Sequence, residues 1–529
     1  MFIFVRETIY FNKFMKKLLL LILFLASITV NAATNNIHSV NIVKTDPVET
    51  DVLGDANDDK TVNVNDITTI AEFILNGSAN SWNQKNADVN GDNVINVNDI
   101  AGTATIILGG DNPDIDDNTV KVTYDGTSAK VLVAGNVKQY ITVDSSSADV
   151  IITVSPDLKD KVTYILTGTT TEGSFTLTGS TKLALELNNV NIKNSDGAAI
   201  DIECGKSIDV NIVNDNYLTD GPGSQKACFY VKGHAEFSGD GVLNISGNSK
   251  CGYRSNEYTQ LKSKFTGLII VRAVSDGIHV GEYFKQNSGN LMVMEVGGDA
   301  IQVELDDESE DTDNGNIIIK GGSIIGSTTK EDTDVLKADK LVSIQGGSLT
   351  LNSNGGAVWD EEKLKVSGCA CISCNTFEMT DGLLFLSATG NGGKGISADS
   401  IVTINNGSLT ISTYGDVHTD AEHEDDTKPQ CIKADQSIYI NGGNVQTFSM
   451  YGKGFSYDDE TPKEFLINGG TVVAVGEKKS EPSGGTQTSF TYSKQKIVGG
   501  ETYTFNNVTF VAPQGFSKDN AKVLVSGAE

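Results

Sequence analysis

The sequence is poor in basic residues and in proline. Lys and Arg number 40 against 69 Asp and Glu, which gives a formal net charge of −29 at pH 7. Such an acidic chain repels nucleic acid, so its charge argues against a nucleic-acid partner and against unaided binding of an acidic polymer. Only eight Pro accompany 55 Gly, a balance that favours many tight turns between short strands.

Apolar runs long enough to cross a membrane are also missing. A basic pair after Met15 leads into the apolar run 18–26, and a small-residue cleavage site follows at Ala32. This pattern predicts a secretory signal peptide in residues 1–32, with residues 1–14 as an upstream extension. The apolar run is too short to span a bilayer comfortably. We therefore expect an exported protein, extracellular or held in a cell-surface complex, with no membrane span.

Cysteine is scarce and odd in number, with seven residues, which is unusual for a disulfide framework. Thiols at or beside predicted core positions, where Cys behaves as a small apolar residue, are Cys228, Cys251 and Cys431. A second group, Cys369, Cys371 and Cys374, is spaced closely enough to suggest a metal cluster. Zinc prefers closed sites with four ligands, and no fourth ligand of matching spacing is present. We favour structural thiols over a zinc site.

After a polar linker at residues 33–50 come two copies of a twelve-residue loop. Oxygen-bearing side chains recur at positions 1, 3, 5, 9 and 12 of each loop, the spacing that surrounds a calcium ion. An apolar run that we expect to be helical follows each loop, at 67–75 and 100–108. The candidate Ca²⁺ ligands are Asp55, Asn57, Asp59, Thr61, Asn63 and Asp66 in the first loop and Asp88, Asn90, Asp92, Val94, Asn96 and Asp99 in the second.

The paired loops strongly resemble a type I dockerin, the module that docks secreted polysaccharide-degrading proteins onto cohesins. The resemblance covers residues 51–110. Each loop ends in Asp rather than Glu and has no entering helix before it, and Lys60 fills a position in the first loop where Gly suits the sharp turn, so we expect the first calcium site to be weaker. The resemblance implies that positions ten and eleven contact a cohesin: Val64, Asn65, Val97 and Asn98. The alternative is a calcium-stabilised cap without a partner.

A second linker at 111–119 leads into a long repetitive region. Apolar residues recur two places after an Asp or its equivalent at Ile200, Phe229, Tyr253, Ile278, Ile301, Leu336, Val358, Ile396, Ile432 and Phe455. The short intervals fit one turn of a parallel β-solenoid, and the long ones fit a turn with an inserted loop. The fold class is therefore mainly β, with a solenoid at 161–476, an N-terminal β cap at 120–160 and a C-terminal β cap at 477–529.

The repetitive region is also similar to a known family. Its opening phrase, NNVNI…SDGAAI, and its later DGI and GG phrases resemble secreted right-handed parallel β-helix proteins. That family binds cellulose-like and pectic polysaccharides, carries calcium and is related to pectate lyases. The later repeats depart from the pattern, because Gly356, Lys394, Gln430 and Lys453 replace the Asp. Any calcium ladder is thus confined to the middle repeats.

Three aspartates open successive middle repeats: Asp276, Asp299 and Asp334. Equivalent positions of a solenoid stack about 4.8 Å apart, so the carboxylates repel one another and favour a bound calcium ion. The alternative is that each Asp bonds the amide two residues on, as in an Asx turn.

The residue after each core position should face solvent, because strand side chains alternate. That row reads Tyr230, Arg254, His279, Gln302, Lys337 and Trp359. Aromatic faces and long polar groups suit sugar rings and uronate carboxylates, although a solvated strand face looks similar.

Three functions remain open. The first is a calcium-dependent binding protein for plant-type polysaccharides of the pectin or cellulose kind, tethered through the dockerin to a cohesin. The second is a calcium-dependent pectate-type lyase, for which Lys337 is the candidate base and Arg254 the stabiliser of developing charge. The third is a passive surface adhesin. We favour binding, because acidic neighbours raise the pKa of Lys337 and make it a poor base.

Overall fold

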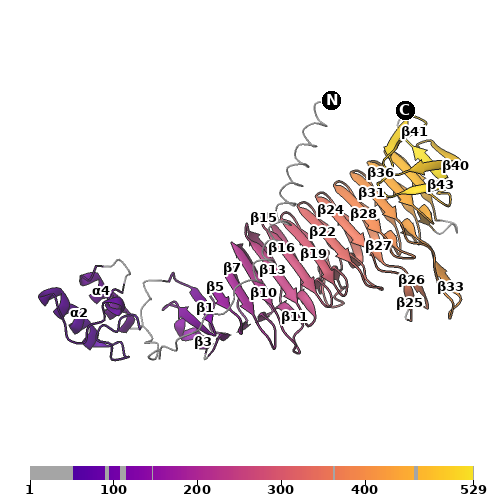
Figure 1. The fold of residues 1–529 in the computed structure, drawn as a ribbon. Helices are drawn as coiled ribbons and strands as arrows, with labels where there is room; N and C mark the ends of the chain where they lie inside the picture. Colours follow the sequence, from indigo (N-terminus) through magenta and orange to yellow (C-terminus); the bar gives the residue numbers. More distant parts are fainter. Residues whose placement is uncertain are drawn as a thin grey trace, which may run out of the picture. The chain divides into compact units, whose positions relative to one another are not determined.

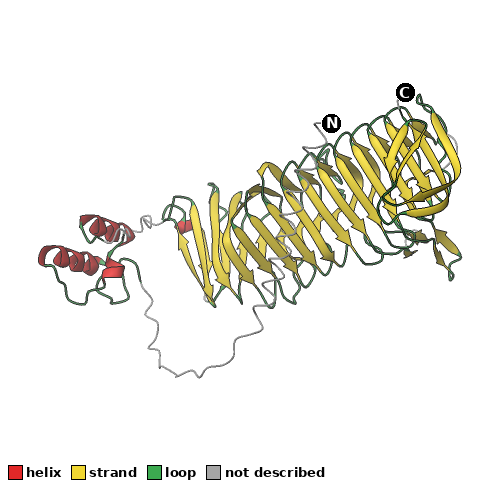
Figure 2. Cartoon of the chain, turned by 45° about the horizontal axis from the view of Figure 1, so that its top comes forward, coloured by secondary structure: helices red, strands yellow, loops and turns green. Residues whose placement is uncertain are grey.

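The structure is a computed structural model. It describes residues 52–89, 94–107, 115–145, 147–361, 364–457 and 463–527. The predicted signal peptide at 1–32 and the linker at 33–50 lie outside these residues. The chain is mainly β, with its short helices near the N-terminus (Figures 1 and 2). Among the described helices, none is both long and apolar enough to span a membrane.

The N-terminal region holds three short helices. They are α2 (Val64–Asn76), α3 (Gln84–Ala87) and α4 (Val97–Ile107). The side chain of Asn63 caps α2 by accepting the N–H of Asn65, and Asp66 bonds back to the cap. This capping box explains why the helices begin two residues before the last loop ligand rather than at it. The expectation of no entering helix is wrong for the second loop, because α3 ends immediately before it.

The strands from residue 119 onward first pair in both directions. They are β1 (Thr119–Gly126), β2 (Ser128–Val133), β3 (Ile141–Asp144), β4 (Asp149–Val154), β5 (Val162–Thr170), β6 (Ser174–Thr178) and β7 (Leu183–Lys193). The pairs β1–β2 and β3–β4 are antiparallel, whereas β5 pairs in parallel with β1 and β7. Hairpins therefore lie at the start of the parallel stack, where the cap was predicted.

Three parallel ladders follow, in which each strand pairs with the strand one repeat later (Figure 2). Ladder 1 consists of β8 (Ile200–Glu203), β11 (Ala227–Val231), β14 (Cys251–Ser255), β17 (Ile278–Val280), β20 (Ile301–Val303), the first part of β23 (Leu336–Ile344), the first part of β27 (Ala370–Met379), β29 (Lys394–Ala398), β34 (Gln430–Ala434) and β37 (Lys453–Tyr457). Ladder 2 consists of β9 (Ile208–Val213), β12 (Ala235–Gly239), β15 (Thr259–Phe265), β18 (Phe284–Gln286), β21 (Ile317–Ile319), the remainders of β23 and β27, β30 (Val402–Ile404), β35 (Ile438–Ile440) and β38 (Phe465–Ile467). Ladder 3 consists of β10 (Asp215–Thr219), β13 (Val242–Gly247), β16 (Leu268–Ala273), β19 (Asn290–Val296), β22 (Ser323–Thr328), β24 (Ser348–Ser353), β28 (Leu383–Ala388), β31 (Ser408–Thr413), β36 (Asn444–Ser449) and β39 (Thr471–Gly476).

The predicted core positions share one register of ladder 1, with one exception. Ile301 pairs with Leu336, and Leu336 then pairs with Ile372 rather than with Val358. Val358 belongs instead to a hairpin inserted into that repeat. The error arises because Gly356-Ala357-Val358 copies the local pattern of a repeat, and a local pattern does not show which strands pair. Ile372 is fully buried in the main core.

Glycine pairs turn the chain between ladders 2 and 3. The second Gly of each pair has a positive φ, for example +82° at Gly322. A Cβ at Gly322 would lie 2.1 Å from the carbonyl oxygen of Gly289, so both the backbone conformation and the close packing of repeats require glycine.

Antiparallel strands complete the chain. They are β40 (Ser489–Val498), β41 (Thr502–Phe505), β42 (Val508–Val511) and β43 (Ser517–Ser526). Strand β43 pairs antiparallel with β39 and with β40. A second apolar cluster, which includes Phe448, Phe510 and Phe516, packs beneath them. Strands β41 and β42 pair antiparallel with each other, within the residues where the C-terminal β cap was predicted.

Candidate functional site

The three predicted aspartates form a column along ladder 1. Oδ1 of Asp276 accepts the N–H of Asp299 at 3.0 Å, and Oδ1 of Asp299 accepts the N–H of Asp334 at 2.6 Å. Asp334 continues the series by accepting the N–H of Ala370 at 2.7 Å. Each carboxylate thus bonds the amide one repeat on, not the amide two residues on as in an Asx turn. The column holds successive repeats in register.

Cationic side chains from the chain itself face this column. His279 lies 2.9 Å from Oδ2 of Asp276 through Nδ1 and 3.1 Å from Glu304 through Nε2. Lys337 Nζ lies 3.2 Å from Oδ2 of Asp299. Burial opposes protonation of His279, but its two carboxylate partners outweigh burial and raise its pKa. Burial raises the pKa of Asp299, while Lys337 acts in the opposite direction.

These contacts bear on the predicted calcium ladder. In Asp276 and Asp299 one carboxylate oxygen bonds an amide and the other faces His279 or Lys337. His279 and Lys337 thus supply part of the charge compensation that we expected from calcium, whereas Asp334 has no ion pair among the described residues. A calcium ion that bridges Asp276, Asp299 and Asp334 would have to displace Lys337 from Asp299. Calcium at these three residues stays a prediction.

The predicted solvent-facing row is partly buried. Tyr230 is 3% exposed and His279 is 4% exposed. Tyr230 packs in a small outer cluster and accepts a hydrogen bond from Lys226, while Glu304 covers His279. Arg254 lies 3.9 Å from Glu304. The expectation of a solvent-facing row is wrong for these two residues, because Ala227, Cys251 and Lys226 contact Tyr230 and Glu304 covers His279.

Trp359 does not belong to the row. Ser373 pairs with Lys337 on ladder 1 and occupies the expected place. Trp359 lies on a hairpin, β25 (Val358–Asp360) and β26 (Lys365–Ser367), and stacks on His423 with ring centroids 3.8 Å apart. His423 joins the strands of a second hairpin, β32 (His418–Asp420) and β33 (Asp425–Thr427). Asp425 accepts the N–H of Val366 at 2.7 Å, which fastens the hairpins together.

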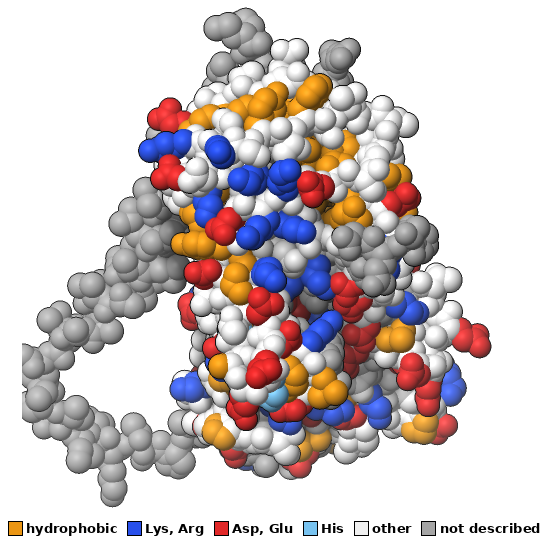
Figure 3. All heavy atoms as spheres, turned by 90° about the vertical axis from the view of Figure 1, so that its right-hand side faces the viewer, with side chains coloured by type: hydrophobic (Ala, Val, Ile, Leu, Met, Phe, Trp, Pro, Cys, Tyr) orange, Lys and Arg blue, Asp and Glu red, His pale blue; other side chains and the backbone are white. Residues whose placement is uncertain are grey.

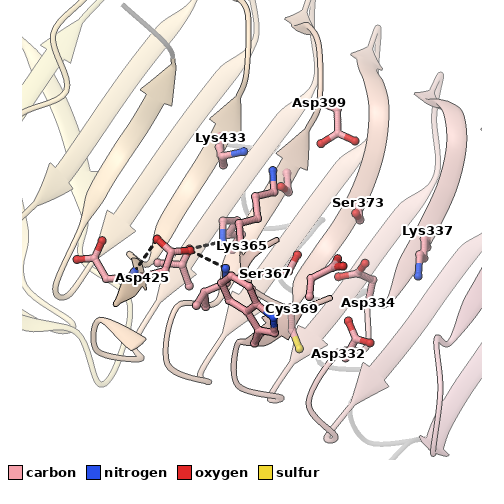
Figure 4. Close-up of a pocket in the computed structure, with 18 of the residues that line it drawn as sticks. Asp332, Asp334, Lys337, Lys365, Ser367, Cys369, Ser373, Asp399, Asp425 and Lys433 are labelled. Atoms are coloured by element: carbon pink, nitrogen blue, oxygen red, sulfur yellow. Dashed lines mark hydrogen bonds between the residues drawn. The ribbon is translucent and has the colours of Figure 1, made fainter. Parts of the chain in front are cut away.

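The two hairpins and ladder 1 enclose a pocket of about 850 Å³. Its strand wall carries Lys337, Ser373, Ser397 and Lys433 in register on successive strands. Strand spacing of about 4.8 Å makes this wall roughly 14 Å long. Figure 4 shows Lys337, Ser373 and Lys433 on the strands, with Lys365 and Asp425 beside them on the hairpins. The pocket is therefore an elongated site rather than a single-residue cavity.

Charges of both signs line the pocket. The acids are Asp332, Asp334, Asp360, Glu361, Asp399, Asp425 and Asp426, and the bases are Lys337, Lys365, Lys394 and Lys433. Figure 3 shows Lys and Arg side chains gathered in a band beside Asp and Glu on one face of this acidic protein. Trp359 adds an aromatic surface, and its buried indole N–H has no acceptor among the described residues. The pocket thus combines groups that suit a polar, partly anionic ligand.

Sequence reasoning missed Lys394 and Lys433 as members of this site. In the sequence Lys394 stands out only as a replacement for Asp. In the structure it is 5% exposed and lines the pocket. Burial, with a smaller contribution from the nearby charge of Lys433, lowers the pKa of Lys394 to about 8. The signal available in the sequence was a lysine at a position that repeats as Asp. The pocket itself was invisible, because two hairpins far apart in sequence build it.

The dockerin-like loops present buried carboxylates. Asp55, Asp66 and Asp99 are each 0% exposed. Asp55 accepts the amides of Asp59 and Lys60 at 3.0 and 2.9 Å. Within the described residues none of the three buried carboxylates forms an ion pair, and uncompensated buried charge is costly. These residues therefore fit a bound cation. Asn90 and Asp92 lie outside the described residues.

The backbone of the first loop also meets the expectation of a strained turn. Lys60 has φ +70°, a left-handed conformation that disfavours residues other than glycine. Its amide nevertheless points to Asp55. A weaker first calcium site stays a prediction, now with a backbone conformation to support it.

The predicted cohesin-contacting residues lie at the starts of α2 and α4. Val64 is 65% exposed and Val97 is 69% exposed, and Asn65 and Asn98 beside them are also exposed. Leu75, on the same helix as Val64, is 81% exposed. These side chains are therefore accessible, and cohesin contact at Val64, Asn65, Val97 and Asn98 stays a prediction.

All seven cysteines are free and buried. Cys371 and Cys374 belong to the main core, whereas Cys369 lines the pocket. The three therefore do not converge on one point, in line with the expectation of structural thiols. Among the described residues, one group of mixed metal-ligand types comes together: Cys251, Asp276 and His279 lie within 4.8 Å of one another.

Comparisons with known proteins bear on both parts of the chain. A model of carbohydrate-binding domain-containing proteins matches residues 146–392 and 373–478, more than half of the chain. A type I dockerin model matches residues 53–102. No curated protein matches the chain.

One solved structure, of the polysaccharide lyase-like protein from C. thermocellum (gadolinium derivative), is similar with 21% identity, a TM-score of 0.38, and coverage of 45% of this chain and 92% of that one. A likeness at this level carries no functional argument. The family matches are decisive by themselves. The chain belongs to the family of carbohydrate-binding domain-containing proteins, and it carries a type I dockerin domain ahead of its carbohydrate-binding domain.

Proposed function

We propose that this protein is a secreted, non-catalytic polysaccharide-binding protein. The dockerin attaches it to a cohesin-bearing protein, and the repeat domain binds polysaccharide. The pocket between ladder 1 and the two hairpins carries the proposal. It is the place where an aromatic side chain, long cations and an elongated wall occur together. Binding along the buried part of the predicted row has less support, since Tyr230 and His279 are nearly inaccessible.

We interpret the fold of the repeat domain as a right-handed parallel β-helix. Three ladders of parallel strands, each advancing by one repeat, support this. Crossover connections between parallel strands of one sheet are almost always right-handed. The consequence for binding is a rigid wall, because each strand is held by two neighbours. Side chains such as Lys337, Ser373 and Lys433 therefore keep a fixed spacing.

The chemistry of the pocket favours a polysaccharide that contains uronic acids, as pectin does. Lys365 and Lys433, the second of which already pairs with Asp435, can form charge-assisted hydrogen bonds to carboxylates. Trp359, half-buried beside the pocket, offers aromatic surface to a sugar, while His423 covers one face of its ring. The acids along the same walls oppose an anionic polymer, so calcium in solution should help by screening or bridging them. Neutral plant glycans of the cellulose type are the second candidate, with the same Trp359 surface.

Binding by immobilised polysaccharide in native electrophoresis tests the proposal. Full-length protein should be retarded by polygalacturonate in calcium buffer, and Trp359→Ala should weaken that retardation by about tenfold, because a stacked aromatic contributes roughly 1 kcal/mol or more. Phe385→Ala is the matched control, since Phe385 is 46% exposed on β28 but lies outside the pocket. Equal retardation of wild type and Trp359→Ala would show that the glycan binds elsewhere.

The dockerin proposal has its own test. The same Val-Asn pair stands at positions ten and eleven of both loops, so a cohesin could bind in two orientations related by a half-turn. Val64→Asp and Val97→Asp each place a charge in one of these two equivalent positions. If two orientations related by a half-turn are both used, each single variant should still bind a type I cohesin, whereas the double variant should not. Loss of binding in one single variant alone would show that a single orientation is used, and full binding by the double variant would place the contact on another surface.

A further inference from the structure

We propose that Cys251, Asp276 and His279 form a binding site for a divalent transition metal such as Zn²⁺, which joins two successive strands of ladder 1. Cys251 lies on one strand, and Asp276 and His279 lie on or just before the next one. The site is separate from the pocket, because none of the three residues lines it. The proposal therefore does not depend on polysaccharide binding.

Cys251 stands at the head of the aspartate column. Each Asp of that column lies two residues before a core position, and Cys251 has the same place before Tyr253, which pairs with Ile278. The N–H of Gly252 donates to the carbonyl oxygen of Asp276 at 3.1 Å, so strand pairing holds the thiol beside the carboxylate. Cys251 packs in the small outer cluster rather than in the main core. The chain thus places a thiol next to Asp276 where the column would continue with a carboxylate.

Three different donor atoms converge at this point. Oδ2 of Asp276 lies 2.9 Å from Nδ1 of His279 and 3.8 Å from Sγ of Cys251. One ligand atom from each residue lies within 4.8 Å of the other two. In a tetrahedral zinc site with bonds of about 2.0–2.3 Å, the donor atoms lie roughly 3.3–3.6 Å apart. The observed separations lie close to these values, so small side-chain shifts bring the three atoms onto one ion and leave a fourth position for water.

Neighbouring groups orient two of the ligands. Oδ1 of Asp276 accepts the N–H of Asp299, which leaves Oδ2 for the metal. The carboxylate of Glu304 lies 3.1 Å from Nε2 of His279. It favours the tautomer with the proton on Nε2, so that Nδ1 keeps a lone pair. A carboxylate beside the far nitrogen commonly orients a metal-bound imidazole, and Glu304 is therefore a positioning residue.

Donor type and charge select the class of metal. Calcium prefers a shell of oxygen ligands, whereas thiolate and imidazole together suit zinc and similar transition metals. A thiolate and a carboxylate neutralise a divalent ion while His279 stays neutral, and a site without net charge suits residues as buried as Cys251 and His279, which are 5% and 4% exposed. Arg254 opposes a second cation nearby, but Glu304 pairs with it at 3.9 Å. The side chain of Asp276 is 15% exposed, which leaves the ion a route from solvent.

The site differs from the predicted calcium column. It uses one aspartate of that column, and Asp299 and Asp334 contribute no ligand to it. It also gives a role to a thiol that faces a carboxylate, whereas the thiol of Cys204 bonds a main-chain carbonyl. Without the metal, the contact between His279 and Asp276 still joins the two strands. The metal therefore adds stability to a fold that exists without it.

Cobalt binding to the full-length protein tests the proposal. Co²⁺ is the probe, because a thiolate bound to it gives a charge-transfer band in the near ultraviolet, and excess Ca²⁺ is present to fill the dockerin loops. Wild-type protein should show this band, and Cys251→Ser and His279→Gln should each lose it. Co²⁺ and Zn²⁺ should also raise the melting temperature of the wild-type repeat domain, but not that of the two variants.

Cys204→Ser is the matched control. Cys204 is also buried, and its thiol donates to the carbonyl oxygen of Thr181 at 3.4 Å. Serine keeps a donor for that bond, so the cobalt band should be unchanged. Glu304→Gln should keep the band but weaken Co²⁺ affinity by about 10- to 100-fold, the usual cost of losing a group that orients a ligand.

Wild-type protein without a thiolate band in excess Ca²⁺ overturns the proposal, and so does a band that survives in Cys251→Ser. If Cys251→Ser does not fold, alkylation of the wild-type protein followed by mass spectrometry decides instead. Zn²⁺ should slow the alkylation of Cys251 but not that of Cys204. Equal rates for Cys251 with and without Zn²⁺ would show that its thiol does not bind the metal.

Discussion

The residues two places before the core positions of ladder 1 form two halves with different chemistry. In the earlier half Asp276, Asp299 and Asp334 each accept the main-chain N–H one repeat on. In the later half Lys394 has that position, and its own N–H donates to the carbonyl of Cys369 at 2.8 Å. The main-chain N–H groups at this position thus donate to Asp carboxylates in the earlier half, whereas the N–H of Lys394 in the later half donates to a main-chain carbonyl.

This difference decides what a lysine near the column can do. Buried carboxylates in the earlier half hold Lys337 as a counter-ion. The later half has no such carboxylate in the column, and Lys394 bonds only neutral acceptors. One residue type is thus a permanent cation in the first half and a weakly basic amine in the second. The pocket lies where the halves meet, since Asp334 and Lys394 both line it.

Removing calcium should have the largest effect on stability. It should unfold the dockerin-like loops, whose buried carboxylates have no ion pair among the described residues, and spare ladder 1, where the chain's own cations pair with aspartates. Chelation should unfold residues 53–107, because Asp55, Asp66 and Asp99 are buried without an ion pair and metal binding there is coupled to folding. The ladders should keep their structure, since His279 and Lys337 pair with Asp276 and Asp299, and burial and the charge of Asp299 raise the pKa of Asp334 to about 7. Calorimetry with and without chelator checks this. A melting transition of residues 53–107 that stays at the same temperature in chelator would contradict it.

Asp299→Ala should be the next largest change. It leaves the N–H of Asp334 and the ammonium of Lys337 without their acceptor, so the free energy of unfolding should fall by about 3 kcal/mol. Asp299→Asn keeps an oxygen for the amide and should lose less. Urea denaturation measures both. Equal losses would show that the amide bond contributes nothing and that only the charge matters.

Lys394→Met should act in the opposite direction. Because the folded-state pKa of Lys394 is lowered to about 8, the unfolded chain binds more protons than the folded one between about pH 8 and its ordinary pKa of about 10.4. Wild-type stability should therefore rise with pH across that window, and Lys394→Met should be flat there. At pH 7 the variant should be more stable by about 2 kcal/mol. A destabilised variant would mean that the ammonium is well accommodated.

Much of the repeat domain could be predicted from sequence because each repeat restates its pattern locally. The core positions from Ile200 to Leu336 follow from spacing alone. Val358 was misassigned because a hairpin insertion imitates a repeat, and the true partner, Ile372, is recognised only from pairing. The burial of Tyr230 depends on Ala227, Cys251 and Lys226, which pack around it on the outer side of ladder 1, and strand alternation does not show such contacts.

The functional pocket was predictable in part. Lys337 and Trp359 were both named, yet for a continuous row rather than for two walls of one pocket. Lys394 and Lys433 were missed because their importance depends on hairpins about 60 residues apart in sequence, fastened by the bond from Val366 to Asp425. Long-range contacts of this kind leave no periodic signal.

The smallest effect is expected from Lys453→Met. Lys453 continues the column two repeats beyond Lys394 but is exposed, so its replacement should change the free energy of unfolding by less than about 0.5 kcal/mol. Urea denaturation under the conditions used for Lys394→Met gives the comparison. A change as large as that of Lys394→Met would show that position in the column, rather than burial, sets the behaviour of these lysines.

Hydrogen–deuterium exchange with and without a bound oligogalacturonide locates the glycan and so tests binding in the pocket. We expect slower exchange in the hairpins β25–β26 and β32–β33 and in the neighbouring strands β27, β29 and β34. Exchange in β11, β14 and β17, which carry Tyr230, Arg254 and His279, should not change. Protection of β11 to β17 with none in the hairpins would contradict the account and move the binding surface to the earlier half of ladder 1.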